Sequence, residues 1–167
     1  MTADRPPLKF EDLVIGEERR SSSRTITEAE IVEFARQYDP QWFHTDPEAA
    51  RQSHFGEVVA SGVHVLAIWR QLDHEINSDI DYVCGIGFDN FRLKTALRPG
   101  DTVYVTSRIL SKELSKSGKP RGTCVGYYEM RNQNDQVVLQ FESINLVHTR
   151  AAAAREGPVN ANAPLEK

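Results

Sequence analysis

A carboxylate and an imidazole lie five residues apart in the segment Tyr38-Asp-Pro-Gln-Trp-Phe-His-Thr-Asp46. Because Pro40 disfavours helical backbone at Asp39, we expect an irregular turn that directs Asp39 and His44 into one cleft. An Asp and a His that share a water molecule can orient it, remove its proton during attack and return a proton to a neighbouring atom. The alternative is that Asp39 only caps the turn and that His44 packs or faces solvent.

Two predicted helix starts favour the catalytic interpretation. Asp46 and Pro47 are typical of a helix that begins just after His44, and the positive end of its dipole would favour the neutral imidazole that a general base requires. Ser61 and Gly62 predict a further helix, whose free N–H groups suit an oxygen that becomes negative during a reaction. Ser61 itself either contacts substrate or serves as the N-cap of that helix.

Helices are predicted on both sides of the Asp–His segment. Thr27-x-x-Glu30 is a capping box, so a helix should follow it and stop near Tyr38. The helix from about Ser61 is apolar on nearly every side, which is typical of a buried helix. The remainder predicts antiparallel strands, so the expected fold class is α+β, with a curved sheet wrapped around one buried helix. The expected strands are residues 82–93, 102–110, 123–130 and 137–148, with an early strand near residues 19–25.

These residues resemble the MaoC-like dehydratases and (R)-specific enoyl-CoA hydratases, which have the hot-dog fold. The resemblance covers nearly the whole chain, from Phe10-Glu-Asp-Leu-Val-Ile-Gly16 through the Asp–His segment and Phe55-Gly-Glu-Val-Val-Ala-Ser-Gly62 to Leu97-Arg-Pro-Gly-Asp-Thr102. The family's motif has Asp and His separated by four residues, as Asp39 and His44 are here. Where active hydratases usually carry Asn-Pro and a His before the helix Gly, this chain has Gln41-Trp42 and Ser61.

The resemblance implies reversible addition of water to an α,β-unsaturated acyl thioester. Asp39 and His44 would activate the water that attacks the β-carbon and then supply the proton to the α-carbon. The N–H of Gly62 would bind the thioester oxygen, and the Gln41 amide would face the substrate. No metal or redox cofactor is expected, and coenzyme A enters only as part of the substrate.

The resemblance also implies a homodimer or a higher oligomer. Hot-dog domains generally pair edge strands, and in related proteins the acyl tunnel lies at the subunit interface. The expected partner molecule is an acyl-CoA or an acyl-carrier thioester. Two other functions stay open: a non-catalytic acyl-thioester-binding hot-dog subunit, and an acyl-CoA thioesterase, against which the Asp-x4-His spacing argues.

Basic residues gather in a predicted hairpin that contains Lys112, Lys116, Lys119 and Arg121. Such a hairpin could contact the phosphates of coenzyme A. The alternative is a solvated turn, because exposed hairpin tips are commonly charged.

Composition excludes several classes of protein. With 20 Lys and Arg against 24 Asp and Glu in 167 residues, the formal charge of −4 disfavours nucleic acid and anionic membranes as partners. No apolar run could span a bilayer and no signal peptide is recognisable, so we expect a cytoplasmic protein. The two cysteines suggest neither a zinc site nor a disulfide framework. We expect a flexible N-terminus over residues 1–9, one domain over residues 10–149 and a disordered tail over residues 150–167.

Overall fold

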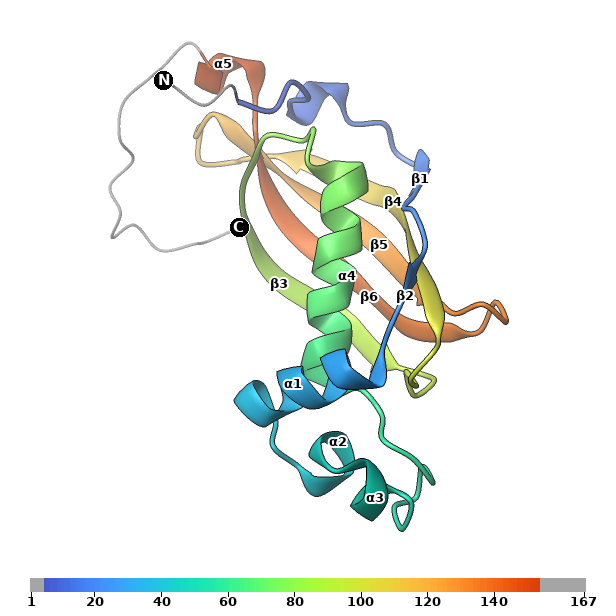
Figure 1. The fold of residues 1–167 in the computed structure, drawn as a ribbon. Helices are drawn as coiled ribbons and strands as arrows, with labels where there is room; N and C mark the ends of the chain where they lie inside the picture. The colour runs from blue at the N-terminus through green and yellow to red at the C-terminus, as the bar shows by residue number, and fades with distance from the viewer. Residues whose placement is uncertain (1–4, 154–167) are drawn as a thin grey trace.

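A computed structural model describes residues 5–153 of the chain. Its sheet has the strand order β1-β4-β5-β6-β3, every pairing is antiparallel, and β2 also pairs with β4. Figure 1 shows the long strands curving behind helix α4, which confirms the predicted α+β fold with a curved sheet around one buried helix. The strands are β1 (Glu18–Arg20), β2 (Arg24–Thr25), β3 (Tyr82–Leu93), β4 (Thr102–Leu114), β5 (Arg121–Arg131) and β6 (Val137–His148).

Helix α4 (Gly62–Asn77) is the buried helix that the apolar run predicted. It begins at a proper N-cap, because the hydroxyl of Ser61 accepts a hydrogen bond from the N–H of His64 at 3.2 Å. Its inner face contributes Ile68 and Leu72, both 2% exposed, to the main core. The helix therefore lies fixed across the sheet, and its first turn is held in one place.

The inner face of the sheet completes this core. Side chains along β5 alternate between buried and half-buried positions, as expected for a strand with one covered face. Phe141 of β6 is fully buried, and its ring contacts those of Trp69 on α4 and Tyr128 on β5 at centroid distances of 4.7 and 5.3 Å. This aromatic group joins the helix to the sheet.

Three helices gather at the N-terminal end of α4: α1 (Glu28–Tyr38), α2 (Trp42–Thr45) and α3 (Pro47–Ala50). The capping box is present as predicted, and α1 ends at Tyr38. The prediction of an irregular turn is wrong for α2, which forms a short helical turn. Pro40 restricts only the residue before it. The backbone after it bonds helically, with the N–H of Asp46 donating to the carbonyl of Trp42 at 3.0 Å.

The early strand is interrupted, and the central hairpin is longer than predicted. Ser21 separates β1 from β2 because its hydroxyl accepts a hydrogen bond from the N–H of Val105 at 2.9 Å. Strand β4 continues to Leu114 and β5 begins at Arg121, so both reach beyond the predicted bounds. The reason is continued pairing, since Leu114 lies opposite Gly122 in the ladder.

Both ends of the described chain contact the rest of the domain. In the N-terminal segment predicted as flexible, Leu8 forms a bridge with Ile80, and Lys9 donates to the carboxylate of Asp81 at 2.8 Å. The helix α5 (Arg150–Ala153) replaces the first residues of the predicted disordered tail. Its Arg150 pairs with Asp12 in the short 3-10 helix η1 (Phe10–Asp12). The rest of these predictions falls on residues 1–4 and 154–167, outside the described residues.

Within residues 5–153, no helix is long and apolar enough to cross a membrane.

Candidate active site

The structure brings Asp39 and His44 together. Asp39 is the C-cap residue that follows α1, and His44 lies in α2, so the link of four residues folds the imidazole back towards the carboxylate. His44 Nε2 lies 3.9 Å from Asp39 Oδ2. That distance is too long for a direct hydrogen bond but leaves room for one water molecule to contact both groups.

The hydrogen bond of Nδ1, the other ring nitrogen, determines which nitrogen of His44 carries the proton. Nδ1 lies 2.6 Å from the carbonyl oxygen of Val59, inside the protein. A carbonyl only accepts hydrogen bonds, so Nδ1 must carry the hydrogen and Nε2 of the neutral ring must present a lone pair. The side chain of His44 is only 8% exposed, which also limits its rotation. The atom that faces Asp39 is therefore the basic one.

Gln41 holds the carboxylate. Its Nε2 donates to Asp39 Oδ1 at 3.2 Å, and its backbone N–H donates to the Asp39 carbonyl at 2.8 Å. Oδ1 is thereby occupied, and Oδ2 is the oxygen turned towards His44. The sequence prediction assigned the Gln41 amide to the substrate; in the structure this amide contacts Asp39, and its contact with substrate stays a prediction. Trp42, which follows it, is 49% exposed.

The predicted helix-dipole effect on His44 is not supported. Asp46 does cap α3, as predicted, and its carboxylate accepts hydrogen bonds from the N–H groups of Glu48 and Ala49, both at 3.0 Å. These donors are therefore occupied, and a negative charge stands at that helix end. The orientation of His44 comes from Val59 instead.

Gly62 occupies the first position of α4, where N–H groups have no partner within the helix. A Cβ at this position would lie 2.7 Å from Cδ1 of Leu93 in β3, so only glycine fits here without displacing that side chain. The hydroxyl of Ser61 is committed to the N-cap bond, which confirms the capping alternative. Contact between Ser61 and substrate stays a prediction.

Val59 links the Asp39–His44 pair to Gly62 at the start of α4. It accepts the His44 hydrogen bond and lies only three residues before Gly62, so the chain between them can extend at most about 10 Å. Residues 59–61 are buried, and the N–H of Ala60 donates to the Leu97 carbonyl at 2.9 Å. Only a short stretch of chain therefore separates the residue that binds the imidazole from the N–H at the start of α4.

Comparison with known protein families identifies the family of this chain. Residues 10–126, which include the Asp–His segment and the start of α4, match the "MaoC like domain" family. The chain belongs to the MaoC-like domain family.

Curated relatives and solved structures agree with this membership. This MaoC-like chain is 30% identical to the 3-hydroxyacyl-thioester dehydratase Z of Mycobacterium tuberculosis over 102 residues, which is 59% of this chain and 68% of that protein. The crystal structure of a MaoC-like dehydratase from Rhodospirillum rubrum aligns with a TM-score of 0.77 and 34% identity, covering 86% of this chain and 98% of that one. The (R)-hydratase of A. caviae aligns with a TM-score of 0.65 at 19% identity, covering 81% of this chain and 97% of that one, and shows the common hot-dog fold.

The basic hairpin of this MaoC-like chain lies at the other end of the sheet. Figure 1 places the β4–β5 connection opposite the end where α1, α2 and α3 gather. Lys112 is a structural residue, because its Nζ donates to the carbonyls of Phe10, Glu11 and Leu13. Within one protomer the structure does not bring the predicted phosphate-binding group (Lys112, Lys116, Lys119 and Arg121) together with Asp39 and His44.

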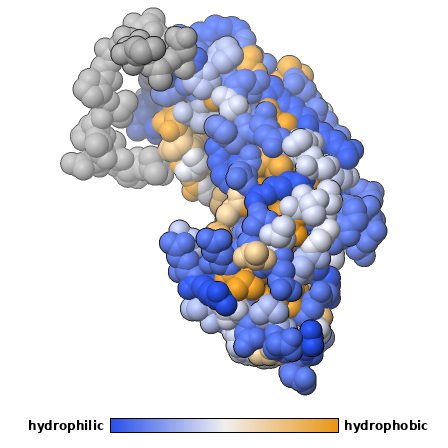
Figure 2. Space-filling model, viewed as in Figure 1, coloured by the Kyte–Doolittle hydropathy of each residue, from blue (hydrophilic) through white to orange (hydrophobic). Residues whose placement is uncertain are grey.

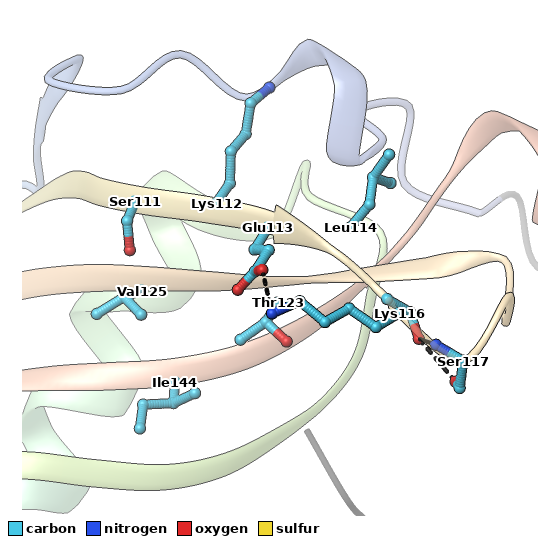
Figure 3. A pocket seen from close by; sticks show the side chains of 10 residues that line it. Ser111, Lys112, Glu113, Leu114, Lys116, Ser117, Thr123, Val125 and Ile144 are labelled. Atoms are coloured by element: carbon cyan, nitrogen blue, oxygen red, sulfur yellow. Dashed lines mark hydrogen bonds and ion pairs between the residues drawn. The ribbon is translucent and has the colours of Figure 1, made fainter.

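A hollow of about 900 Å³ lies beside this hairpin. Figure 3 shows Glu113, Thr123, Val125 and Ile144 on one side of the sheet, while Lys112 points to the other side, towards the N-terminal segment. Lys116 forms an ion pair with Glu113 at 2.9 Å. The hollow is therefore a groove on the outer face, separate from the Asp–His pair.

Sequence reasoning missed the environment of His64, two residues after Gly62. Its ring stacks on Phe34 of α1 with centroids 4.3 Å apart, and Nδ1 is buried without a hydrogen-bond partner. Burial lowers its pKa to about 4, so the ring is neutral at pH 7. Its place in the first turn of a nearly apolar helix is the one signal that would have indicated a buried histidine.

We expect His64→Gln to flatten the pH dependence of stability. The ordinary pKa of 6.5 falls to about 4 on folding, so between these values the unfolded chain binds more protons and stability declines as pH falls. Above pH 6.5 the ring is neutral in both states, and the full stability of the wild-type protein is present. As pH falls towards 4, the wild-type free energy of unfolding drops by up to about 3 kcal/mol, at about 1.36 kcal/mol per pKa unit. Urea unfolding at pH 7.5 and pH 4.5 measures it. His74→Gln, an exposed substitution on the same helix, should keep the wild-type slope, and equal slopes for all three proteins would contradict the prediction.

Proposed function

We propose that this protein is an (R)-specific enoyl-CoA hydratase or 3-hydroxyacyl-CoA dehydratase, which adds water reversibly to an α,β-unsaturated acyl thioester. The observation that carries the proposal is the hydrogen bond from His44 Nδ1 to Val59, which leaves a lone pair on Nε2 facing the Asp39 carboxylate. Membership of the MaoC-like family and the similarity to a 3-hydroxyacyl-thioester dehydratase support it.

In the proposed reaction a water molecule lies between Asp39 Oδ2 and His44 Nε2. Nε2 takes one proton as the water oxygen attacks the β-carbon, and the electron pair of the double bond moves towards the thioester oxygen. The N–H of Gly62 stabilises the charge on that oxygen. The Asp39–His44 pair then delivers a proton to the α-carbon, and the reverse sequence removes water. Because the addition is redox-neutral, we propose that it needs no metal or redox cofactor.

We further propose a homodimer at least, in the cytoplasm, where its acyl-thioester substrate would be met. Strand β3 is at the edge of the sheet, with one side free of strand pairing in the described chain. Phe88 and Leu93 on this strand are 46% and 50% exposed, and Figure 2 shows apolar residues at the surface around an indentation of the molecule. Pairing with a second copy would cover such an edge.

The proposed hydratase and the two alternative functions differ in their effect on crotonyl-CoA. A hydratase removes the conjugated double bond of crotonyl-CoA, a thioesterase releases free thiol, and a binding subunit does neither. The purified protein, tested alone, should cause loss of enone absorbance without appearance of thiol. Release of thiol, or binding without either change, would reject the hydratase assignment.

A further inference from the structure

The carbonyl that binds the His44 ring lies in an irregular segment of the chain. In the described structure residues 51–61 form neither helix nor strand, and Figure 1 shows them as the link from α3 to α4. A regular ladder of backbone hydrogen bonds therefore does not hold the Val59 carbonyl in place. Since a hydrogen bond requires both partners to be correctly placed, the orientation of His44 depends on whatever fixes this segment.

The corner of the chain just before β4 holds this segment at two points. On one side of Val59, the N–H of Ala60 donates to the Leu97 carbonyl at 2.9 Å. On the other side, Arg98 Nη1 donates to the Phe55 carbonyl at 3.1 Å. The carbonyl that accepts the His44 hydrogen bond thus lies between two attachments, and two adjacent residues supply both of them.

The corner that carries Arg98 is itself well fixed. Leu97 is 1% exposed, and Pro99 restricts the backbone on the other side of Arg98. The carboxylate of Asp101 accepts a hydrogen bond from the backbone N–H of Arg98 at 2.8 Å and another from Nε2 of Gln133 at 2.8 Å. The Arg98 side chain therefore extends from a part of the backbone that can serve as an anchor.

The residue that Arg98 holds also contacts the imidazole by a second route. The ring of Phe55 packs against that of Phe43 with centroids 5.9 Å apart, and the Phe43 ring packs against His44 at 4.4 Å. The segment thus contacts His44 through the Val59 carbonyl and, by way of Phe43, through the Phe55 ring. Movement of Phe55 would disturb both contacts.

Arg98 contributes more to this geometry than to the stability of the fold. Its guanidinium also pairs with the carboxylate of Glu57, and the two side chains are 40% and 48% exposed. Ion pairs with this exposure contribute little to stability. A hydrogen bond from a charged donor to a carbonyl is one of the stronger kinds, and it is the contact that holds the chain at Phe55. Variants of Arg98 should therefore fold.

We propose that Arg98 is a positioning residue. By holding the Phe55 carbonyl it fixes the segment that presents the Val59 carbonyl, which keeps the hydrogen on Nδ1 of His44 and the lone pair on Nε2. The effect on turnover rests on the proposed function, whereas the effect on the His44 ring does not.

The test compares Arg98→Met, which keeps an apolar stem but has no donor, with Arg98→Lys, whose ammonium group can still donate to both oxygens. Nitrogen NMR of the imidazole rings is recorded at about pH 8, above the ordinary pKa of histidine. The signals that disappear in His44→Gln belong to His44. The wild-type protein and Arg98→Lys should show hydrogen on Nδ1 alone, whereas Arg98→Met should show a mixture of the two neutral forms.

Turnover of crotonyl-CoA provides the second measurement. Arg98→Met should lower kcat by about 10- to 100-fold with little change in KM, because a small displacement of a catalytic group is costly and Arg98 itself does not contact substrate. Arg98→Lys should recover most of the rate. Arg51→Met is the matched control, since Arg51 follows α3, is 66% exposed and pairs with Glu48, and it should match the wild-type protein in both measurements.

The outcomes separate this inference from the proposed function. An unchanged His44 ring in Arg98→Met would overturn the inference, whether or not the rate falls. The same shift of hydrogen in Arg51→Met would overturn it as well. A changed ring in Arg98→Met and a wild-type ring in Arg98→Lys would support the inference even in a protein that hydrates no enoyl-CoA, and that absence of hydration would reject the proposed function alone.

Discussion

Replacing His44 by Gln, or Asp39 by Asn, is expected to lower kcat for hydration of crotonyl-CoA by about 100-fold or more. In His44→Gln the new amide could still bond the Val59 carbonyl, but it has no basic nitrogen to take the proton of water. In Asp39→Asn the new amide oxygen could still accept from Gln41, but the side chain would face His44 without a negative charge. Initial rates of the purified variants, followed by the loss of enone absorbance, measure the effect.

The double variant and a neighbouring histidine sharpen this test. If Asp39 and His44 act on one water molecule, the double variant should be hardly slower than the slower single variant, because residues that act as a unit are not additive. His54→Gln, an exposed substitution between the Asp–His segment and α4, should leave kcat unchanged. Wild-type rates in both single variants would show that the pair is not catalytic.

The second large effect concerns stability. Phe141→Ala is expected to lower the free energy of unfolding by about 3–5 kcal/mol, the usual cost of emptying a fully buried aromatic site. The ring has neighbours on three sides, with Trp69 on α4, Tyr128 on β5 and Phe88 on β3. Its removal would loosen α4 from the sheet, and with it Gly62 at the start of that helix. Urea unfolding followed by circular dichroism gives the value.

A matched substitution on the same aromatic cluster provides the control. Phe88 also contacts Phe141, but it is 46% exposed, so Phe88→Ala should cost clearly less stability. A loss of less than about 1 kcal/mol in Phe141→Ala would mean that the site collapses around the missing ring and that the cluster does not hold α4.

Local signals allowed most of the elements to be predicted. The capping box at Thr27 and the N-cap at Ser61 depend on contacts within three residues, so they are readable from sequence and both are present. The turn signals on either side of residues 123–130 predicted a strand there, and β5 (Arg121–Arg131) contains it. Asp39 and His44 were predicted to meet because the link between them is only four residues long, and they do.

Residues whose role depends on distant partners could not be predicted in the same way. The charge of Lys112 indicated a surface contact, but its ammonium group is bound by carbonyls about a hundred residues away in sequence. Asp73 has the sequence surroundings of an ordinary surface acid. Only the packing of β5 and β3 against α4 buries it in a cavity. The N–H groups whose dipole was expected to act on His44 are bonded by the local cap, Asp46.

The contact between the N-terminal segment and α5 has a practical consequence for attaching this protein to a support. The N–H of Arg150 lies 3.1 Å from a carboxylate oxygen of Glu11, so the first and last described elements meet at one place. Figure 1 shows this meeting point at the end of the sheet opposite α1, α2 and α3. If the protein is attached to a support near either element, the end of the molecule that carries Asp39 and His44 faces away from the support. A circular permutant that joins these two elements with a short peptide should also tolerate new ends in the β4–β5 connection.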